Sequence, residues 1–304
     1  MIKAFSVAEH TFLLEMPDGH FLWPALGQYS PFVTDVPEHP LFHLSLVDDI
    51  TVEEKRPLLV DVPKESGMPR IELYDTGDCF YFEMAPLAMA EACGRLLFGK
   101  DFKEASLQLL DDSADRALFA LNNAMMLLFA FSTACLNTLE MHSSVVVNGG
   151  KAYMFLGKSG TGKSTHSSLW LKHVPGSRLL NDDNPVIRIG DDGVVRAYGS
   201  PWSGKTPCYH NASAPVGAIV RINQAPRNAI SRLGVLEAYA SVYSSCSGYK
   251  PDRTMSDGLH HTLEHIALNI PCYKLDCLPD KEAAELCAGE VKVSIISDNE
   301  PETV

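Results

Sequence analysis

The segment Met154–Trp170, MFLGKSGTGKSTHSSLW, constrains the fold more than any other part of the chain. It places Gly157, Gly162, Lys163 and Ser164 in the pattern G-x-x-x-x-G-K-[ST]. The apolar run AYMFL precedes this pattern, and an amphipathic segment follows it. Because a glycine-rich turn from a strand into a helix leaves successive backbone N–H groups pointing outward, this context predicts a phosphate cradle rather than a plain turn.

Individual loop residues have expected tasks in such a cradle. Lys163 is expected to reach the β- and γ-phosphates as a point charge. The hydroxyl of Ser164 is expected to ligate Mg²⁺, which prefers hard oxygen ligands. The residues expected to bind the nucleotide phosphates are Gly157, Lys158, Ser159, Gly160, Thr161, Gly162, Lys163, Ser164 and Thr165.

Two adjacent carboxylates end the next strand-like run, RLLNDD. Asp182 and Asp183 follow Lys163 by about 19 residues, a distance that a helix and a strand can span. A carboxylate at the end of a strand beside a phosphate loop can hold Mg²⁺, directly or through water. Because adjacent strand residues point to opposite faces, one carboxylate can serve the metal and the other can act as a general base. The alternative is a solvated turn, which is the interpretation for the similar run at 191–193.

Composition limits the classes of function. The chain has 304 residues and a net charge of −13, which argues against a broad surface for nucleic acid or anionic membrane. The N-terminus lacks a signal-peptide pattern, and the eight scattered cysteines form no CxxC pair. The long apolar stretch Ala117–Met141 contains two asparagines and lacks basic flanks, which favours a buried helix over a membrane span. A cytoplasmic protein is expected.

The pattern of strand-like and helix-like runs predicts two structural units and a C-terminal tail. Short apolar or alternating runs (IKAFSVA, TFLLEM, HFLWPAL, RIELYD and CFYFEMA) predict a β-rich module over residues 1–112. A helical pattern begins at Ser113, and mixed strands and helices follow from His142. The expected P-loop domain therefore covers residues 113–296 and includes the leading helix. Residues 297–304 are expected to form a disordered tail.

The run HSSVVVNGGKAYMFLGKSGTGKST, followed by RLLNDD, resembles the kinase domain of HPr kinase/phosphorylase. That family has a histidine, a short apolar hairpin, a phosphate loop, a helix and a paired aspartate at similar spacing. The resemblance covers about residues 139–186 and is faint beyond them. It implies an α/β fold with a mixed sheet, the phosphoenolpyruvate carboxykinase-like P-loop core. Members of the family are often hexameric, so the resemblance also implies a possible homo-oligomer.

The resemblance implies roles for three further residues. Asp183 matches the proposed general base, Asp182 matches the acidic neighbour near the metal, and His142 matches a histidine that tunes the base. The chain also departs from the family pattern. Thr165 stands where the family usually has Glu, and the later Glu-x-Arg-Gly signature is replaced by GSPWSGK, in which Lys205 is expected to supply a positive charge for phosphate.

The expected function is therefore a nucleotide-dependent phosphotransferase that uses ATP, or another phosphoryl donor, and Mg²⁺. Its acceptor would be a hydroxyl on a protein, a peptide or a small molecule, with no role for nucleic acid or membrane. Two alternatives stay open. One is a nucleotide-binding regulatory protein without turnover, which the departures at Thr165 and the missing signature favour. The other is a carboxykinase-like enzyme that acts on a small carboxylate.

Overall fold

The computed structural model describes residues 1–60, 68–204, 206–248 and 253–298, with the backbone alone for 293–298. The chain divides into two compact units, Met1–Ser132 and Thr133–Val304. The sequence pattern predicts a boundary near residue 113, but the long helix that begins there lies almost wholly in the first unit. Both units contain a mixed sheet, so the fold is mixed α/β. All eight cysteines are free thiols.

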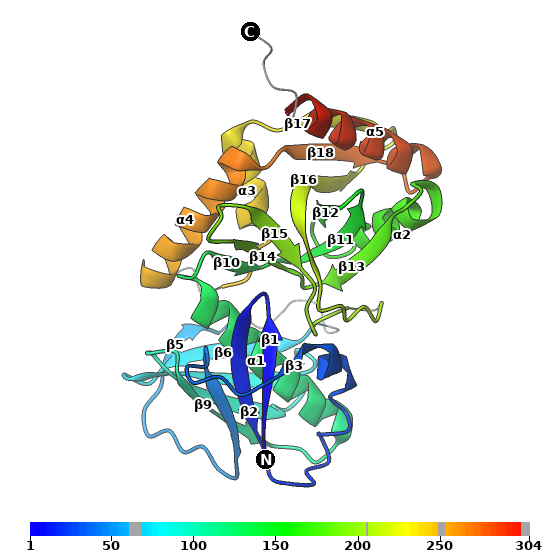
Figure 1. Ribbon diagram of the computed structural model, residues 1–304. Helices are drawn as coiled ribbons and strands as arrows, with labels where there is room; N and C mark the ends of the chain where they lie inside the picture. The colour runs from blue at the N-terminus through cyan, green and yellow to red at the C-terminus, as the bar shows by residue number, and fades with distance from the viewer. Residues whose placement is uncertain (61–67, 205, 249–252, 299–304) are drawn as a thin grey trace. The chain divides into compact units, whose positions relative to one another are not determined.

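The first unit contains one nine-stranded sheet, in the order β3-β1-β2-β4-β9-β8-β7-β6-β5 (Figure 1). Most neighbours are antiparallel, but β4 is parallel to both β2 and β9. The strands are β1 (Ile2–Val7), β2 (His10–Glu15), β3 (Val33–Thr34), β4 (His43–Val47), β5 (Arg56–Leu59), β6 (Arg70–Asp75), β7 (Cys79–Ala85), β8 (Gly94–Gly99) and β9 (Glu104–Leu109).

One strand predicted in this unit is absent. The run HFLWPAL (20–26) forms consecutive turns that lead into the 3₁₀ helix η1 (Gly27–Phe32). The backbone N–H of Trp23 donates to the carbonyl of His20 at 3.0 Å, and the N–H of Ala25 donates to Leu22 at 3.0 Å. Pro24 has no N–H to donate to a neighbouring strand. Local turn hydrogen bonds therefore replace the predicted ladder.

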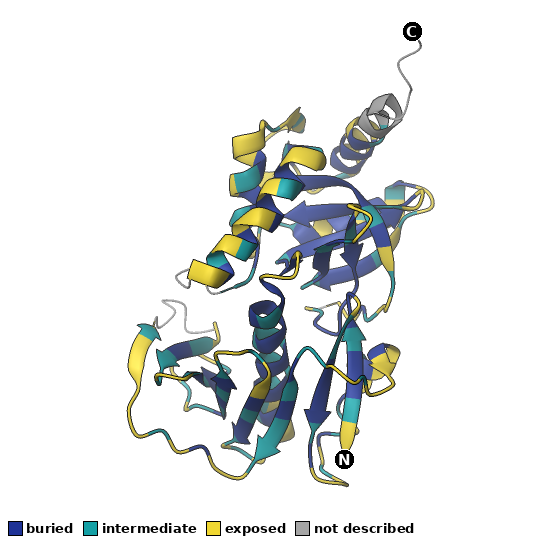
Figure 2. Cartoon of the chain, turned by 60° about the vertical axis from the view of Figure 1, so that its left-hand side comes forward, coloured by how far each residue is buried: buried dark blue, intermediate teal, exposed yellow. Residues whose placement is uncertain are grey.

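The long apolar helix is α1 (Ala114–Thr133), and it is the one helix in the described part of the chain with the length and hydropathy of a membrane span. Just over half of that window, 56%, is buried within the protein (Figure 2). The ring of Phe131 packs edge-on against Phe82 and Phe80 of the sheet. The side chain of Asn122 accepts hydrogen bonds from Tyr29 and Gln28. The helix thus packs as the core helix of the first unit, where Asn122 has hydrogen-bond partners.

The second unit contains the other mixed sheet, with the main order β10-β14-β15-β16-β12-β11-β13. The long strand β16 is parallel to β12 and to β18, while β17 pairs with β18. The strands are β10 (Thr138–Glu140), β11 (Ser143–Asn148), β12 (Lys151–Leu156), β13 (Arg178–Asp183), β14 (Val186–Ile189), β15 (Val195–Tyr198), β16 (Ser213–Gln224), β17 (Ala229–Arg232) and β18 (Cys272–Cys277).

Helices cover both faces of this second sheet (Figure 1). One face packs against α2 (Lys163–His173) and α5 (Lys281–Asp298), around the buried indole of Trp170. The other face packs against α3 (Val235–Tyr243) and α4 (Arg253–Asn269). The helix α5 continues to Asp298, so the predicted tail is wrong at residues 297 and 298, and its remainder lies outside the described residues. The packing of α2 on the first face fixes the position of this helix and of the loop that precedes it.

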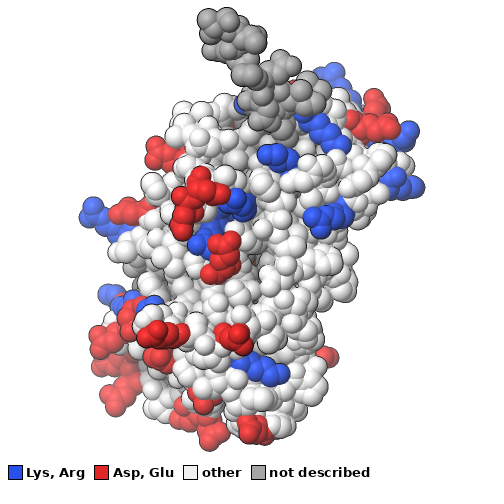
Figure 3. Space-filling model, in the orientation of Figure 1, with Lys and Arg blue, Asp and Glu red and all other residues white. Residues whose placement is uncertain are grey.

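Charged side chains of both signs are scattered among uncharged ones on the face seen in Figure 3. Several form close pairs at the surface, such as Arg196 with Asp192 at 2.6 Å in the second unit. Such exposed pairs contribute little to stability because solvent screens them.

Candidate functional site

The predicted phosphate loop lies between β12 and α2 and has an unusual backbone. Gly157, Gly160 and Gly162 all have positive φ angles, of 156°, 78° and 99°. A Cβ at Gly157 would lie 2.4 Å from Oγ1 of Thr161, so the loop has no room for a side chain there. The hydroxyl of Thr161 donates to the carbonyl of Lys158 at 2.8 Å and braces the turn. Glycine is the residue that adopts such angles without strain, and the loop is therefore built as the motif predicts.

The helix α2 begins directly after this loop and leaves its first amides available. Its N-cap is Gly162, which has no side chain that could cap the helix, and the first turn contains no acidic residue. The first N–H groups of a helix have no partner within the helix and carry partial positive charge. Ser164 and Thr165 are exposed in this turn, as are Lys158 and Ser159 in the loop. The arrangement suits an anion.

Lys163 lies at the inner end of the loop with only 8% of its surface exposed. Its ammonium donates to the carbonyl of Gly157 at 3.1 Å and contacts Nε2 of His142 at 2.8 Å. Burial lowers the pKa of Lys163, while the charges of Asp183 and Asp182 act in the opposite direction. The lysine is thus a buried cation whose charge interacts with both predicted carboxylates.

His142 joins this lysine to the predicted general base. Its Nδ1 lies 3.1 Å from Oδ1 of Asp183, and Asn184 donates to the other carboxylate oxygen at 3.3 Å. Because the Lys163 ammonium can only donate, Nε2 of His142 accepts and Nδ1 carries the hydrogen. The result is a continuous chain from Lys163 through His142 to Asp183. The sequence predicted all three residues, and the structure brings them together.

The loop that follows β15 folds back onto the acidic pair. Asp183 forms an isolated bridge with Ser203, and the N–H of Gly204 donates to the carbonyl of Asp182 at 2.7 Å. The hydroxyl of Ser203 donates to the same carbonyl at 2.9 Å. A Cβ at Gly204 would lie 3.0 Å from Cβ of Asp183. Asp183 itself has a φ of 123°, a strained angle for a residue other than glycine. The GSPWSG run therefore helps to fix Asp183.

The described hydrogen-bonded chain from Lys163 through His142 to Asp183 does not include two other predicted site residues, Lys205 and Asp182. The predicted phosphate-binding Lys205 lies outside the described residues. Asp182 is buried, at 4% exposure, and no hydrogen bond among the described side chains joins it to Ser164, its expected partner at a metal. The indole of Trp202, five per cent exposed, is part of the core of this loop.

Glu140 is a site neighbour that the sequence did not reveal. It ends β10, two residues before His142, and is only 1% exposed. Neither of its carboxyl oxygens has a hydrogen-bond partner at ordinary distance among the described residues. Burial, together with the negative charge of Asp183, raises its pKa to about 8, and the nearby Ser247 opposes the rise. Glu140 is therefore a neutral acid at pH 7. The one sequence feature that could have revealed Glu140 is the position of a glutamate in a short apolar strand.

Arg221 is a second neighbour of the candidate site that the sequence did not reveal. It pairs with Leu156, the residue before the loop, across the parallel strands β12 and β16. Its guanidinium has no carboxylate partner among the described residues, and it binds the hydroxyls of Ser241 at 2.7 Å and Ser244 at 2.6 Å. Its charge also lowers the pKa of Lys163. Arg221 thus adds positive charge beside the cradle and anchors the end of α3.

The chemistry of the donor set fits magnesium. Ser164 supplies a hydroxyl and Asp182 supplies a carboxylate, which are the oxygen ligands that Mg²⁺ prefers. Within the described ranges, no group of three or more His, Cys, Asp or Glu side chains is placed to hold a metal. A magnesium ion at a phosphate loop needs no such group, because phosphate oxygens and water complete its coordination.

Comparisons with known proteins add no relative to this description. No family model matches the chain, and no curated protein matches it at a significant level. The functional assignment therefore rests on the site.

Proposed function

We propose that the protein is a Mg²⁺-dependent phosphotransferase of the HPr-kinase-like kind, on a phosphoenolpyruvate carboxykinase-like P-loop core. It transfers the γ-phosphoryl group of ATP to a hydroxyl on a protein, a peptide or a small molecule in the cytoplasm. The observation that carries the proposal is the hydrogen-bonded chain Lys163–His142–Asp183 at the inner end of a glycine cradle. A loop that only bound phosphate would not need a carboxylate oriented in this way.

In the proposed reaction, the acceptor oxygen forms a bond to the γ-phosphorus while the bond to the β,γ-bridging oxygen breaks. Asp183 takes the proton of the acceptor hydroxyl. His142 orients that carboxylate through its Nδ1–H, and the protein residues provide mainly position and charge. The amides of the first turn of α2 and the ammonium of Lys163 offset the charge of the phosphates.

Magnesium, when bound, would neutralise charge on the β- and γ-oxygens, and Ser164 and Asp182 are the residues that would hold it. The neutral state of Glu140 also supports the proposal. A protonated neighbour leaves the negative charge of Asp183 without a competing carboxylate.

The test combines binding and transfer. Calorimetry measures the affinity for ATP with Mg²⁺, and γ-labelled ATP with a panel of hydroxyl acceptors measures transfer. Lys163→Ala should weaken nucleotide binding by roughly 10- to 100-fold, because a charged hydrogen-bond donor is lost. Asp183→Asn should retain binding and lower transfer by about 10²- to 10⁴-fold.

Asp191→Asn is the matched control, since Asp191 lies in a similar acidic pair at an exposed turn. It should change neither quantity. Nucleotide binding without transfer to any acceptor would favour the alternative of a regulatory protein without turnover, which the departure at Thr165 motivates. Absence of nucleotide binding would overturn the proposal.

A further inference from the structure

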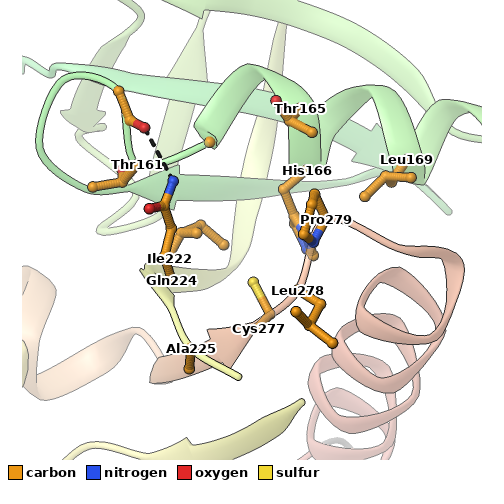
Figure 4. Close-up of a pocket in the computed structure, with 12 residues that line it drawn as sticks. Thr161, Thr165, His166, Leu169, Ile222, Gln224, Ala225, Cys277, Leu278 and Pro279 are labelled. Carbon is orange, nitrogen blue, oxygen red and sulfur yellow. Dashed lines mark hydrogen bonds between the residues drawn. The ribbon is translucent and has the colours of Figure 1, made fainter. Parts of the chain in front are cut away.

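A cavity of about 450 Å³ opens beside the phosphate loop in the second unit. Its entrance is bordered by Gly160, Thr161 and Gly162, and Gln224 donates to the carbonyl of Gly160 at 3.3 Å (Figure 4). Aliphatic side chains make up much of the remaining wall: Leu169, Ile222, Ala225, Leu278 and Pro279. The cavity therefore continues directly from a site for anions into an apolar slot.

The lining of this slot carries no formal charge. Its ionisable members are Cys277 and His166. Burial raises the pKa of the Cys277 thiol, which keeps it protonated. The imidazole of His166 accepts a hydrogen bond from the indole N–H of Trp170. An uncharged slot beside a cationic cradle suits a ligand with a charged end and a neutral, flat end.

His166 gives this slot an unused hydrogen-bond donor. The indole N–H of Trp170 donates to Nε2 of His166 at 3.1 Å. Because an indole nitrogen can only donate, Nε2 is the acceptor, and the neutral ring carries its hydrogen on Nδ1. That Nδ1 is buried and has no partner in the described structure. A buried donor without a partner is costly, and such an atom in a binding-site wall indicates a ligand acceptor.

The position of His166 connects this donor to the loop. It lies in the first turn of α2, two residues after Ser164, and its N–H bonds to the carbonyl of Gly162. In Figure 4 its ring points from α2 towards the segment that carries Cys277, Leu278 and Pro279. The ring is 2% exposed and packs edge-on against Phe155, so its orientation is fixed.

We propose that this cavity is the nucleoside subsite of the phosphotransferase, and that it holds a purine base to which Nδ1–H of His166 donates. The proposal rests on the proposed function, because it assumes that the phosphates occupy the loop. Leu169, Ile222 and Leu278 supply the apolar contact for the base. A two-ring base covers more of this aliphatic wall than a one-ring base and offers ring-nitrogen acceptors. His166 is thus a specificity-determining residue.

The experiment compares ligands that share the phosphates but differ in the base. Calorimetry with Mg²⁺ measures binding of ATP, CTP and inorganic tripolyphosphate to the full chain. The wild type should bind ATP more tightly than CTP. His166→Phe should weaken ATP binding by about fivefold to tenfold, the effect of one lost hydrogen bond, and leave tripolyphosphate binding unchanged.

A second variant avoids any contact with Trp170. Ala225→Trp fills the slot from the end of β16 and should weaken ATP binding by at least about tenfold while tripolyphosphate still binds. Ala229→Trp, at an exposed position on β17, is the matched control and should leave both affinities unchanged. Circular dichroism confirms that each variant is folded.

The outcomes separate the two proposals. Equal binding of ATP and tripolyphosphate by the wild type, or an unchanged ATP affinity in folded Ala225→Trp, would overturn the nucleoside subsite and leave phosphate binding intact. An unchanged ATP affinity in folded His166→Phe would overturn the role of His166. Failure of the wild type to bind either ligand would instead contradict the proposed function.

Discussion

The ammonium of Lys163 lies 2.8 Å from Nε2 of His142, although the two residues come from different sides of a hairpin. The contact exists because β11 and β12 are antiparallel, which places the start of β11 beside the loop that follows β12. The other nitrogen of the same ring lies 3.1 Å from Asp183 at the end of β13. The ammonium of the loop lysine and the carboxylate of Asp183 are therefore linked through one imidazole.

Loss of this imidazole should affect transfer more than binding. In His142→Ala, Lys163 retains the carbonyl of Gly157, but Asp183 loses the donor that orients it. We expect ATP affinity to stay within about threefold and the single-turnover rate of transfer to fall by about 10- to 100-fold. His173→Ala, at the far end of α2, is the control and should change neither. Equal losses of affinity and rate in His142→Ala would contradict this role.

The glycine at the start of the loop allows a sharper test of the cradle. In Gly157→Ala the new methyl group would lie 2.4 Å from the hydroxyl of Thr161, so the loop has to open. Gly160→Ala is the comparison, because its φ of 78° is also positive but no atom lies within 4 Å of the new Cβ. Tripolyphosphate affinity, measured by calorimetry, should fall by more than about tenfold in Gly157→Ala and by less in Gly160→Ala. The reverse order would show that the tight turn is not what binds phosphate.

A substitution at Gly204 tests whether the loop after β15 positions the carboxylate of Asp183. A methyl group there would lie 3.0 Å from Cβ and 3.1 Å from Oδ2 of Asp183, so the carboxylate has to move. We expect Gly204→Ala to lower transfer by about tenfold or more while ATP affinity stays within about twofold. Gly27→Ala, where φ is not in the left-handed region and the new Cβ meets no atom within 4 Å, is the control. An unchanged rate of transfer in Gly204→Ala would show that this loop does not position Asp183.

Glu140 predicts a distinctive dependence of stability on pH. Its folded pKa of about 8 lies above the ordinary value of 4.5, so the folded protein binds a proton that the unfolded chain releases. The free energy of unfolding should therefore fall as pH rises from about 4.5 to about 8. Glu140→Gln keeps a neutral polar group at every pH. It should raise stability at pH 8 by roughly 1–3 kcal/mol and have little effect at pH 4.

Urea unfolding across this pH range provides the measurement, with Glu282→Gln at an exposed position in the first turn of α5 as the control. A constant difference between Glu140→Gln and the wild type at all pH values would show that folding does not raise the pKa of Glu140.

Local sequence patterns predicted the loop and the strands around the candidate site, because these elements depend on interactions between residues close together in the chain. The glycines of the loop fix backbone angles within a few residues, and the apolar run before them and the helix after them follow from residue order. The same holds for RLLNDD, a strand-like run that ends in Asp182 and Asp183. The same kind of pattern wrongly predicted a strand at HFLWPAL, because local turn hydrogen bonds form around Pro24 instead.

Tertiary structure alone decided which side chains meet. The sequence placed the chain in a mixed α/β class and singled out Lys163, His142 and Asp183, but only strand pairing brings them within hydrogen-bond distance. The burial of Glu140, the approach of Arg221 from β16 and the unpartnered Nδ1 of His166 depend on neighbours far away in the chain. Burial and pairing set the charge of these groups, since desolvation acts through the three-dimensional surroundings and has no signature in residue order.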